Sequence, residues 1–288
     1  AIADGGTLYV FGSLSTEVYG NTGTAGVPFT RIQGATLEWG LAAKDSLTKY
    51  QDSLIGLFRN EMGQMVVARV QGYRADRVST SDLEAIIRSY GAFSDATGFA
   101  YMKDGHPFYQ ISFPTGNATW LYDGSTGMWN QRQSGLAETG RHRAELYVNY
   151  LDQTVVSDYE NGRIYKMKPD VYTDNGDPIK RLLASKHLMS RGNPITVDEL
   201  RLFFETGVGL ATGQGSDPLI MLRISKDGGR TWGPQKLKTL GAIGEYLARV
   251  RFQQLGQSED WVFEVSMTDP VPFRLVGEAL QTEVAEWA

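Results

Sequence analysis

The sequence predicts an all-β protein, in which the blades of a β-propeller, complete or incomplete, precede a C-terminal antiparallel region that resembles a sandwich. Glycine accounts for 33 of the 288 residues, against about 7% of an average chain, and glycine supplies the positive-φ positions that tight turns need. Val, Ile, Thr, Tyr and Phe recur in short runs, which is typical of a pleated, half-buried surface. Groups of three or four such runs return roughly every 40 to 50 residues, close to the period of propeller blades.

Short predicted strands fill residues 1–170. Residues 7–13 alternate in hydropathy and end at a glycine, and residues 53–73 have the pattern of a hairpin. Two further segments, 106–133 and 145–168, are interrupted by clusters of turn residues. Because one blade cannot bury both of its faces, we expect successive blades to stack on one another.

A short helix is expected near residues 81–90, as an insertion between strands. Ser and Thr precede the segment as candidate N-caps, acidic side chains occupy its first turn, and Gly91 follows it. The spacing places four side chains on one apolar face, namely Leu83, Ile86, Ile87 and Tyr90.

The pattern changes near residue 190. Residues 171–195 are rich in Pro, Gly, Asp and Asn and are expected to form a linker. Residues 196–288 then contain longer alternating strands, in which Arg249 and Arg251 alternate with apolar neighbours. This alternation predicts a half-exposed antiparallel β region.

The sharpest local motif is an Asp-box, SKDGGRTW, at residues 225–232. Asp227 can accept backbone N–H bonds inside a tight hairpin turn, Gly229 can adopt positive φ, and Trp232 can fold back onto the apolar base of the turn. Sialidases carry such boxes away from their catalytic centres, so we interpret this one as a structural turn. Its residues are Ser225, Asp227, Gly229, Thr231 and Trp232.

Other motifs lack the spacing that chemistry requires. Asp158 and Glu160 lie two residues apart, which is typical of a solvated strand edge rather than of the facing carboxylates of a glycosidase. The glycine-rich stretch 206–218 precedes a strand, whereas a dinucleotide-binding loop precedes a helix. The three histidines are far apart and lack ligand spacing. We therefore expect no catalytic residue, no cofactor and no metal, and a protein that is not an enzyme.

Composition narrows the class further. The absence of cysteine excludes disulfides and thiolate metal sites. A net charge of −5 argues against general DNA binding. Residues 221–251 hold seven basic and two acidic side chains, whereas 259–288 hold seven acidic and one basic, as suits a subunit with differently charged neighbours or solvated strand faces. No signal peptide is expected at residues 1–13, and no membrane insertion by this chain.

Several stretches, in order and spanning nearly the whole chain, resemble the packaged-DNA stabilisation proteins, or tail accessory factors, of short-tailed bacteriophages (podoviruses). The glycine-rich stretch followed by the Asp-box is the most specific part. The stretches are STEVYGNTG, PFTRIQGATLEWGLAAKDS, GRHRAELYV, TDNGDPIKR, ETGVGLATGQGSDP, SKDGGRTW and IGEYLARVRFQQLGQSEDWVFEVSMTDPV.

The resemblance implies a virion structural protein at the head–tail junction, made in the cytoplasm of the host bacterium. Such a protein would plug the portal and tail channel, and would act on packaged DNA only by closing that channel. Its implied partners are a portal or adaptor ring above and a tail needle or tip below. It would form a ring-shaped homo-oligomer, for which six-fold symmetry is expected, on a β-propeller fold without catalytic residues.

Two alternatives stay open. Members of that family carry a further stretch before the STEVYGNTG region, so either the chain is a fragment or another segment supplies the missing blades. The Asp-box also fits a propeller-type carbohydrate-active enzyme or a glycan-binding tail protein. A glycan-binding protein would expose aromatic platforms such as Trp120 or Trp129, whereas the pattern places both on buried blade strands.

Overall fold

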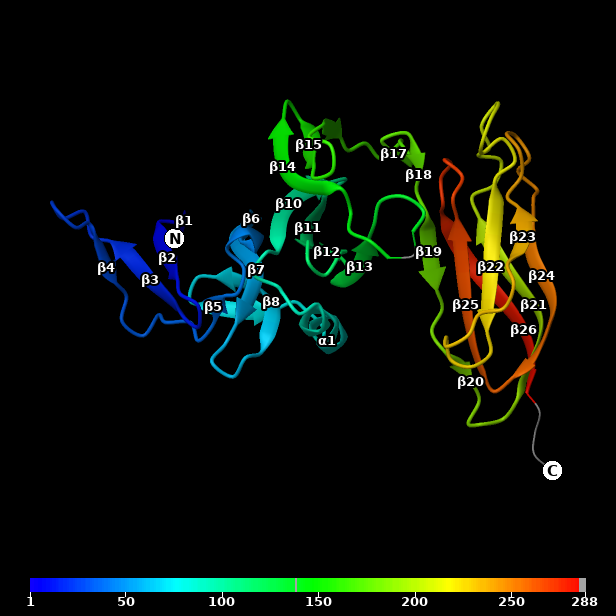
Figure 1. Ribbon diagram of the computed structural model, residues 1–288, viewed down its shortest axis with the longest axis horizontal. Coiled ribbons are helices and arrows are strands. Elements are labelled where there is room, and N and C mark those ends of the chain that lie inside the picture. The colour runs from blue at the N-terminus through cyan, green and yellow to red at the C-terminus, as the bar shows by residue number, and fades with distance from the viewer. Residues whose placement is uncertain (138, 285–288) are drawn as a thin grey trace. The chain divides into compact units, whose positions relative to one another are not determined.

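The all-β prediction is confirmed. The structure is a computed structural model that describes residues 1–137 and 139–284 (Figure 1). Its regular secondary structure is almost entirely β-strand, with one α-helix and one short 3-10 helix among the described residues. The chain divides into two compact units, residues 1–168 and 169–288.

The first unit contains four antiparallel sheets, each built from strands that follow one another along the chain. The first sheet contains β1 (Ile2–Asp4), β2 (Thr7–Phe11), β3 (Thr16–Asn21) and β4 (Phe29–Arg31); the second β5 (Gly40–Leu41), β6 (Thr48–Tyr50), β7 (Ser53–Arg59), β8 (Met65–Gln71) and β9 (Arg74–Arg77). The third contains β10 (Thr97–Lys103), β11 (His106–Phe113), β12 (Ala118–Asp123) and β13 (Met128–Arg132); the fourth β14 (Ala144–Tyr150), β15 (Gln153–Asp158) and β16 (Ile164–Lys166).

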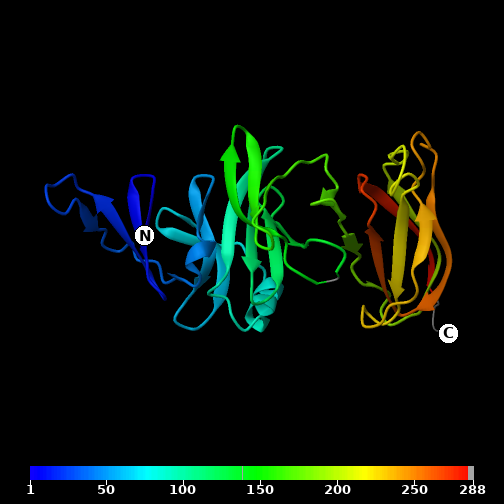
Figure 2. The same cartoon turned by 45° about the horizontal axis from the view of Figure 1, so that its top comes forward.

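Successive sheets pack face to face, as the predicted blades should. Successive side chains of a strand point to opposite faces, and in β7 both faces are buried. Leu54 packs with Tyr9 of the first sheet, whereas its neighbour Ile55 packs with Tyr109 of the third. A separate cluster around Phe99 joins the third sheet to the fourth. Figure 2 shows the strands of these sheets side by side.

The blades repeat in backbone geometry rather than in residue type. A two-residue turn closes the first hairpin of every sheet, and its first residue has φ between +50° and +55°. The strands that lead into three of these turns, β6, β10 and β14, are neighbours in space. The turn residues are Gly5–Gly6, Gln51–Asp52, Asp104–Gly105 and Leu151–Asp152.

The fourth sheet is covered on one face only. Its other face exposes four large apolar side chains, each more than half accessible to solvent. The residues are Leu146, Val148, Tyr150 and Ile164. Between the other sheets, apolar faces of this kind are covered by the next sheet.

The predicted helix is present as α1 (Ser81–Ser89). The Thr80 side chain caps it by accepting the N–H of Leu83 at 3.3 Å. Leu83 and Ile87 are buried, but Ile86 is 38% exposed, so the expected apolar face is narrower by one residue. Glu84 is buried instead, because Arg77 and a serine hydroxyl donate hydrogen bonds to its carboxylate.

The second unit is a sandwich of two antiparallel sheets. One has the order β19-β25-β22-β23, with β20 also paired to β25, and the other has the order β24-β21-β26. Trp261, fully buried between them, donates its indole N–H to the carbonyl of Ile195 at 3.0 Å. The strands are β19 (Arg181–Ala184), β20 (Leu188–Met189), β21 (Ile195–Phe204), β22 (Leu219–Ser225), β23 (Lys236–Thr239), β24 (Val250–Ser258), β25 (Asp260–Met267) and β26 (Leu275–Val284).

The expected linker, residues 171–195, differs from the structure in part. It begins with a short hairpin of β17 (Thr173–Asp174) and β18 (Asp177–Pro178). β19 and β20 then pair with β25 and belong to the sandwich, because Leu188 packs against its core. Turn residues on either side of these short strands concealed them in the sequence.

Candidate functional site

The Asp-box forms the turn that follows β22. The carboxylate of Asp227 accepts the backbone N–H groups of Arg230 at 3.0 Å and Thr231 at 2.8 Å. It also accepts the hydroxyls of Thr231 at 2.6 Å and Ser225 at 2.7 Å. Gly229, at φ +87°, donates its N–H to the Ser225 hydroxyl at 2.8 Å. The side chains of Ser225, Asp227 and Thr231 are therefore all hydrogen-bonded within the turn.

These donors act on the ionisation of Asp227. The hydroxyl of Thr231, its backbone N–H and the Ser225 hydroxyl hold the pKa of the Asp227 carboxyl well below its usual value. The carboxylate therefore remains an ionised acceptor across the neutral range. A group held in this way keeps a loop closed and is unsuited to exchanging protons with a substrate.

Trp232 makes a contact that the sequence did not suggest. Its half-buried ring lies beside Arg223, whose guanidinium carbon is 5.4 Å from the ring centroid. Arg223 in turn donates to Glu264 on β25 at 2.7 Å. The tryptophan thus adds a cation–π contact on the outer face of the sheet.

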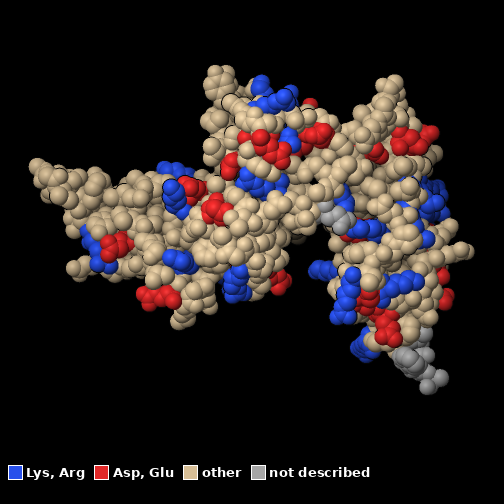
Figure 3. Space-filling view, in the orientation of Figure 1, with Lys and Arg blue, Asp and Glu red and all other residues tan. Residues whose placement is uncertain are grey.

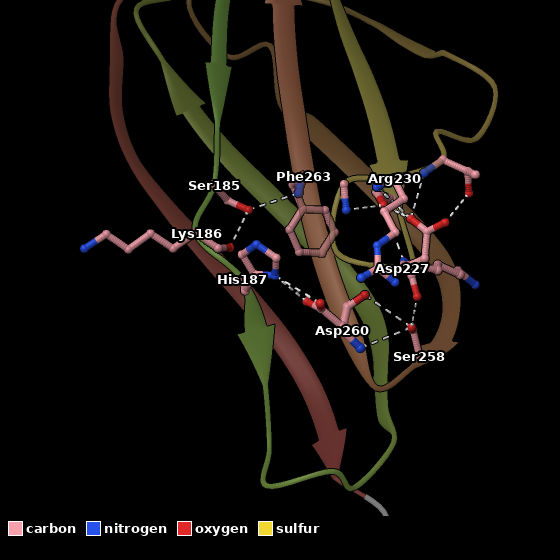
Figure 4. A network of polar contacts seen from close by, with 12 residues as sticks. Ser185, Lys186, His187, Asp227, Arg230, Ser258, Asp260 and Phe263 are labelled. Atoms are coloured by element: carbon pink, nitrogen blue, oxygen red, sulfur yellow. Dashed lines mark hydrogen bonds and ion pairs between the residues drawn. The ribbon is translucent and has the colours of Figure 1, made fainter. Parts of the chain in front are cut away.

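A histidine–aspartate pair that the sequence did not suggest lies against the Asp-box. Nδ1 of His187 is 2.9 and 3.0 Å from the two carboxylate oxygens of Asp260, and Asp227 and Asp260 form a parallel β-bridge (Figure 4). Gly228 has a φ of +70°, a conformation that favours glycine, and a Cβ there would also come within 2.6 Å of the Asp260 carboxylate. The pair is separated by 73 residues along the chain, and no spacing signal could have revealed it.

The His187–Asp260 pair has two features of a hydrolase triad. Ser185, two residues before His187, is already engaged: its hydroxyl accepts the N–H of Phe263 at 3.0 Å and donates to the carbonyl of Lys186 at 2.9 Å (Figure 4). The arrangement therefore fastens the segment before β20 to β25.

The predicted solvated strand edge holds for Glu160, which is exposed, but not for Asp158, which is buried. Asp158 is 5% exposed and lies 3.4 Å from the Arg143 guanidinium, which also contacts Glu160 at 3.2 Å. Arg143 and the two acids thus join β14 to the end of β15. Sequence spacing could not identify this contact, because the arginine precedes the acids by more than ten residues.

The aromatic residues considered as glycan platforms are half-buried. Trp120 donates its indole N–H to the Tyr90 hydroxyl at 3.0 Å, and Trp129 donates to the carbonyl of Val78 at 2.8 Å. Both lie against the cluster between the second and third sheets. They serve packing rather than an exposed platform.

Two cavities stand out. One of about 420 Å³ opens between β6, β10 and β14 and carries tyrosines, amides and a lysine; the other, of about 330 Å³, is an apolar slot in the sandwich. The first cavity is lined by Lys49, Tyr50, Gln51, Ala100, Tyr101, Met102, Pro107, Tyr147 and Asn149. This lining contains no carboxylate, whereas glycoside hydrolysis uses a facing pair.

Within residues 1–137 and 139–284, no group of three or more His, Asp or Glu side chains is arranged to hold a metal ion. In the same part of the chain, no helix is both long enough and apolar enough to span a membrane.

Two family models match the chain. The model described as "Bacteriophage P22 Gp10, beta-propeller" matches residues 2–172, and the model described as "Bacteriophage P22 Gp10, beta-sandwich" matches residues 180–283. The first match covers the four stacked sheets, and the second covers nearly all of the sandwich. A search of curated proteins gave no match.

Among solved structures, the chain is similar to a glycoside hydrolase family 43 arabinoxylan arabinofuranohydrolase from Bacillus subtilis, solved in complex with cellotetraose. The identity is 12%, and the alignment covers 94% of this chain and 63% of that chain, with a TM-score of 0.24. A likeness of that size indicates neither a shared activity nor a shared site.

Proposed function

Because the chain belongs to the bacteriophage P22 Gp10 family of phage stabilisation proteins, we propose that it closes the channel at the head–tail junction after DNA packaging, without enzymatic activity. It is a structural protein of the phage virion, with a propeller region and a sandwich region. The proposal concerns its place in the virion and the way in which it retains DNA.

The observation that carries the proposal is the match of both regions to a stabilisation family, in order and over nearly the whole chain. The chemistry of the described residues supports a scaffold. Asp227 and Asp260 are held by neighbouring groups of their own fold. A net charge of −5 also suits a closure that blocks DNA without gripping its phosphates.

Its proposed partners are other tail proteins. In this proposal the protein contacts an adaptor or portal ring on one side and a needle or tip protein on the other. Several copies, six by expectation, form a ring. The fourth sheet exposes four large apolar side chains on one face, and a contiguous apolar patch of this kind is typical of a surface that binds another protein. The uneven charge of residues 221–251 and 259–288 suits neighbours of different charge.

The role in retention is tested by complementation. A short-tailed phage of this family that lacks the corresponding gene is grown in cells that supply either this chain or an empty vector. We expect particles with the chain to keep their genome protected from nuclease, and particles without it to lose most of their DNA. The Met62→Asp variant, changed at a loop residue that is 86% exposed, is the positive control.

Full genome protection in particles that contain no copy of the chain would overturn the proposed role. The role would also be overturned if purified particles that contain the chain in normal amount released their DNA as fast as particles that lack it. Quantifying the chain in each particle preparation separates these outcomes from poor expression.

A carbohydrate-binding or carbohydrate-active role is the second candidate, favoured by the Asp-box and by the tyrosine-lined cavity between β6, β10 and β14. Incubation of the purified chain with sialosides and bacterial surface glycans tests it. The structural proposal expects no turnover and no saturable binding. Binding that is lost in Tyr101→Ala but kept in Trp232→Ala would instead favour the glycan role.

A further inference from the structure

The edge of the sandwich formed by β23 and β24 carries four basic side chains, which we call the basic edge. Lys236 and Lys238 are exposed on β23. Arg249, just before β24, is exposed, and Arg251, on β24, is half-buried. The two strands lie side by side, and Figure 3 shows basic atoms gathered over them. Four positive charges therefore share one edge of the second unit.

The basic edge lacks the internal partners that other arginines of the sandwich have. Arg223 donates to Glu264 at 2.7 Å, and Arg274 lies 3.0 Å from Glu205. In contrast, no side chain of the basic edge forms a hydrogen bond or an ion pair with another residue of 1–137 or 139–284. Because like charges on neighbouring strands repel each other, carboxylates supplied by a partner would relieve this repulsion without breaking an internal pair.

The loop between these two strands exposes three large apolar side chains. Ile243 is 65% exposed, Tyr246 is 73% exposed and Leu247 is 90% exposed. We call these three residues the apolar tip. A protein interface typically has aromatic and apolar side chains at its centre and charged ones at its rim. The apolar tip and the basic edge together have this composition.

The glycine-rich stretch holds the apolar tip in place. Gly244 donates its N–H to the carbonyl of Gly207 at 3.2 Å, and the Thr206 hydroxyl donates to the carbonyl of Tyr246 at 2.8 Å. A Cβ on Gly207, whose φ is +74°, would lie 2.7 Å from the Tyr246 ring, so glycine lets the two loops close on each other. The tip is therefore preorganised and loses little conformational freedom when it binds.

Protection of the sheet edges does not account for this surface. Lysine on an edge strand prevents pairing with another chain, and both β23 and β24 are edge strands. Exposed apolar side chains have the opposite effect, because they favour association. An edge that only had to remain unpaired would not place Tyr246 and Leu247 between its two basic strands.

The surroundings of the basic edge favour a protein over DNA as its partner. Asp217 accepts the hydroxyl of Thr239 at the end of β23, and Glu245 lies within the loop, where it accepts the N–H of Ala242. These two carboxylates and the net charge of −5 repel a continuous line of phosphates. A phosphate backbone also offers no apolar surface to the tip.

A second copy of the chain is a poorer match than a different protein. Glu205 and Glu264 of a second copy are already paired with arginines of that copy. Asp227 is likewise engaged by its own turn. The carboxylates that the basic edge needs must therefore come mainly from elsewhere.

We propose that the basic edge and the apolar tip together dock onto an acidic surface of a different tail protein. The tip enters an apolar depression, and the four basic side chains face carboxylates around it. The inference rests on the proposed function, because it assigns one surface through which the chain joins its neighbours. The tip supplies most of the affinity, whereas the charges orient the approach and make it sensitive to salt.

Carbodiimide cross-linking in intact particles tests this contact, because the reagent joins a lysine amine to a carboxylate only when the two are in contact. Particles that carry the chain are prepared as in the complementation experiment, cross-linked and analysed by peptide mass spectrometry. We expect links from Lys236 or Lys238 to Asp or Glu residues of a different virion protein. Lys44 and Lys168, which are also exposed, are the internal controls and should give no link to those residues.

Charge reversal measures the contribution of the basic edge. Lys236→Glu combined with Lys238→Glu should reduce the copies of the chain per particle by about tenfold, whereas Lys44→Glu combined with Lys168→Glu should leave that number unchanged. Lys236→Arg combined with Lys238→Arg keeps the charges, so it should enter particles normally and lose only the cross-links. Leu247→Ser tests the tip separately and should also lower the copy number. Circular dichroism checks that each variant is folded.

Three outcomes in particles that contain the chain would overturn the proposal: no link from Lys236 or Lys238, links only to a second copy of the chain, or equal copy numbers for the two charge-reversal variants. It would also fail if the purified chain bound a labelled duplex DNA saturably and lost that binding on charge reversal of the basic edge, since DNA would then be the occupant.

These outcomes are distinct from failure of the proposed function. Particles that show the expected cross-links but lose their DNA would overturn only the role in retention. Particles that retain their DNA without the cross-links would leave that role standing and remove only this docking surface. Absence of the unaltered chain from every particle would overturn both proposals.

Discussion

At the scale of single residues, His142 shows how burial fixes a charge state. Burial lowers the pKa of this imidazole well below its usual value, and the nearby Arg132 and Arg143 guanidinium groups lower it further. Its Nδ1 accepts the N–H of Ala144 at 3.2 Å, which requires a ring nitrogen without a proton. The folded first unit therefore holds a neutral histidine.

This arrangement predicts acid sensitivity of the first unit. The unfolded chain binds a proton at His142 below about pH 6.5, whereas the folded chain does not until its lower pKa is reached. The free energy of unfolding should thus fall as the pH drops from 7 to 5, by up to ~1.4 kcal/mol per pH unit for this group. Urea denaturation of the first unit at several pH values measures it.

His142→Asn, whose side-chain oxygen can still accept the Ala144 N–H, should show a shallower decline with falling pH than the unaltered chain. His187→Asn, in the second unit, is the control and should retain the decline in the first unit. Identical slopes for His142→Asn and the unaltered chain would contradict this account.

The Asp-box is an example of a structural feature that can be predicted from the sequence at the scale of single residues. Its hydrogen bonds lie within seven consecutive residues, so the pattern of letters predicts the turn, although its assignment as a structural element stays a prediction. The contacts of Arg143 with Asp158 and of His187 with Asp260 join residues far apart in the chain. Such pairs depend on strand register and sheet packing, which the local sequence does not contain.

At the scale of elements, the sequence predicted the strands and the helix wherever apolar residues recur with a clear period. β7 and β11 are buried on both faces and bounded by turn residues, and α1 has both a cap and a spaced apolar face. The short strands β19 and β20 were missed, because their pairing with β25 is set by the sandwich core rather than by their own residues.

The N-cap of α1 gives a prediction for this scale. Thr80→Ala removes the acceptor for the Leu83 N–H and should lower the free energy of unfolding of the first unit by about 1 kcal/mol. Thr80→Ser keeps the hydroxyl and should cost little. Chemical denaturation compares the two, and an equal loss in both variants would show that the cap contributes nothing.

At the scale of the whole molecule, each compact unit has apolar clusters of its own. The clusters around Leu57 and Tyr9 lie in the first unit, and the cluster around Trp261 lies in the second. The change of pattern near residue 190 suggested this division, but the sequence could not show that the second unit begins with strands from the expected linker.

Separate cores predict separate responses to mutation. Leu57→Ala should destabilise only the first unit, by about 2–5 kcal/mol, and Trp261→Ala only the second, by about 3–5 kcal/mol, since both side chains are fully buried. Hydrogen-exchange mass spectrometry reads peptides of both units in one experiment. Loss of protection in both units from either substitution would contradict independent cores.

The strand order has a consequence for how the chain acquires its structure during synthesis. In the first unit every sheet is built from strands that follow one another along the chain, so each sheet can form soon after its own strands leave the ribosome. In the second unit β21 pairs with β26, from Ile195↔Val284 to Phe204↔Leu275, and β19 pairs with β25. The sandwich must therefore wait for β26, and its apolar segments remain exposed to chaperones and to neighbouring chains until that strand has been synthesised.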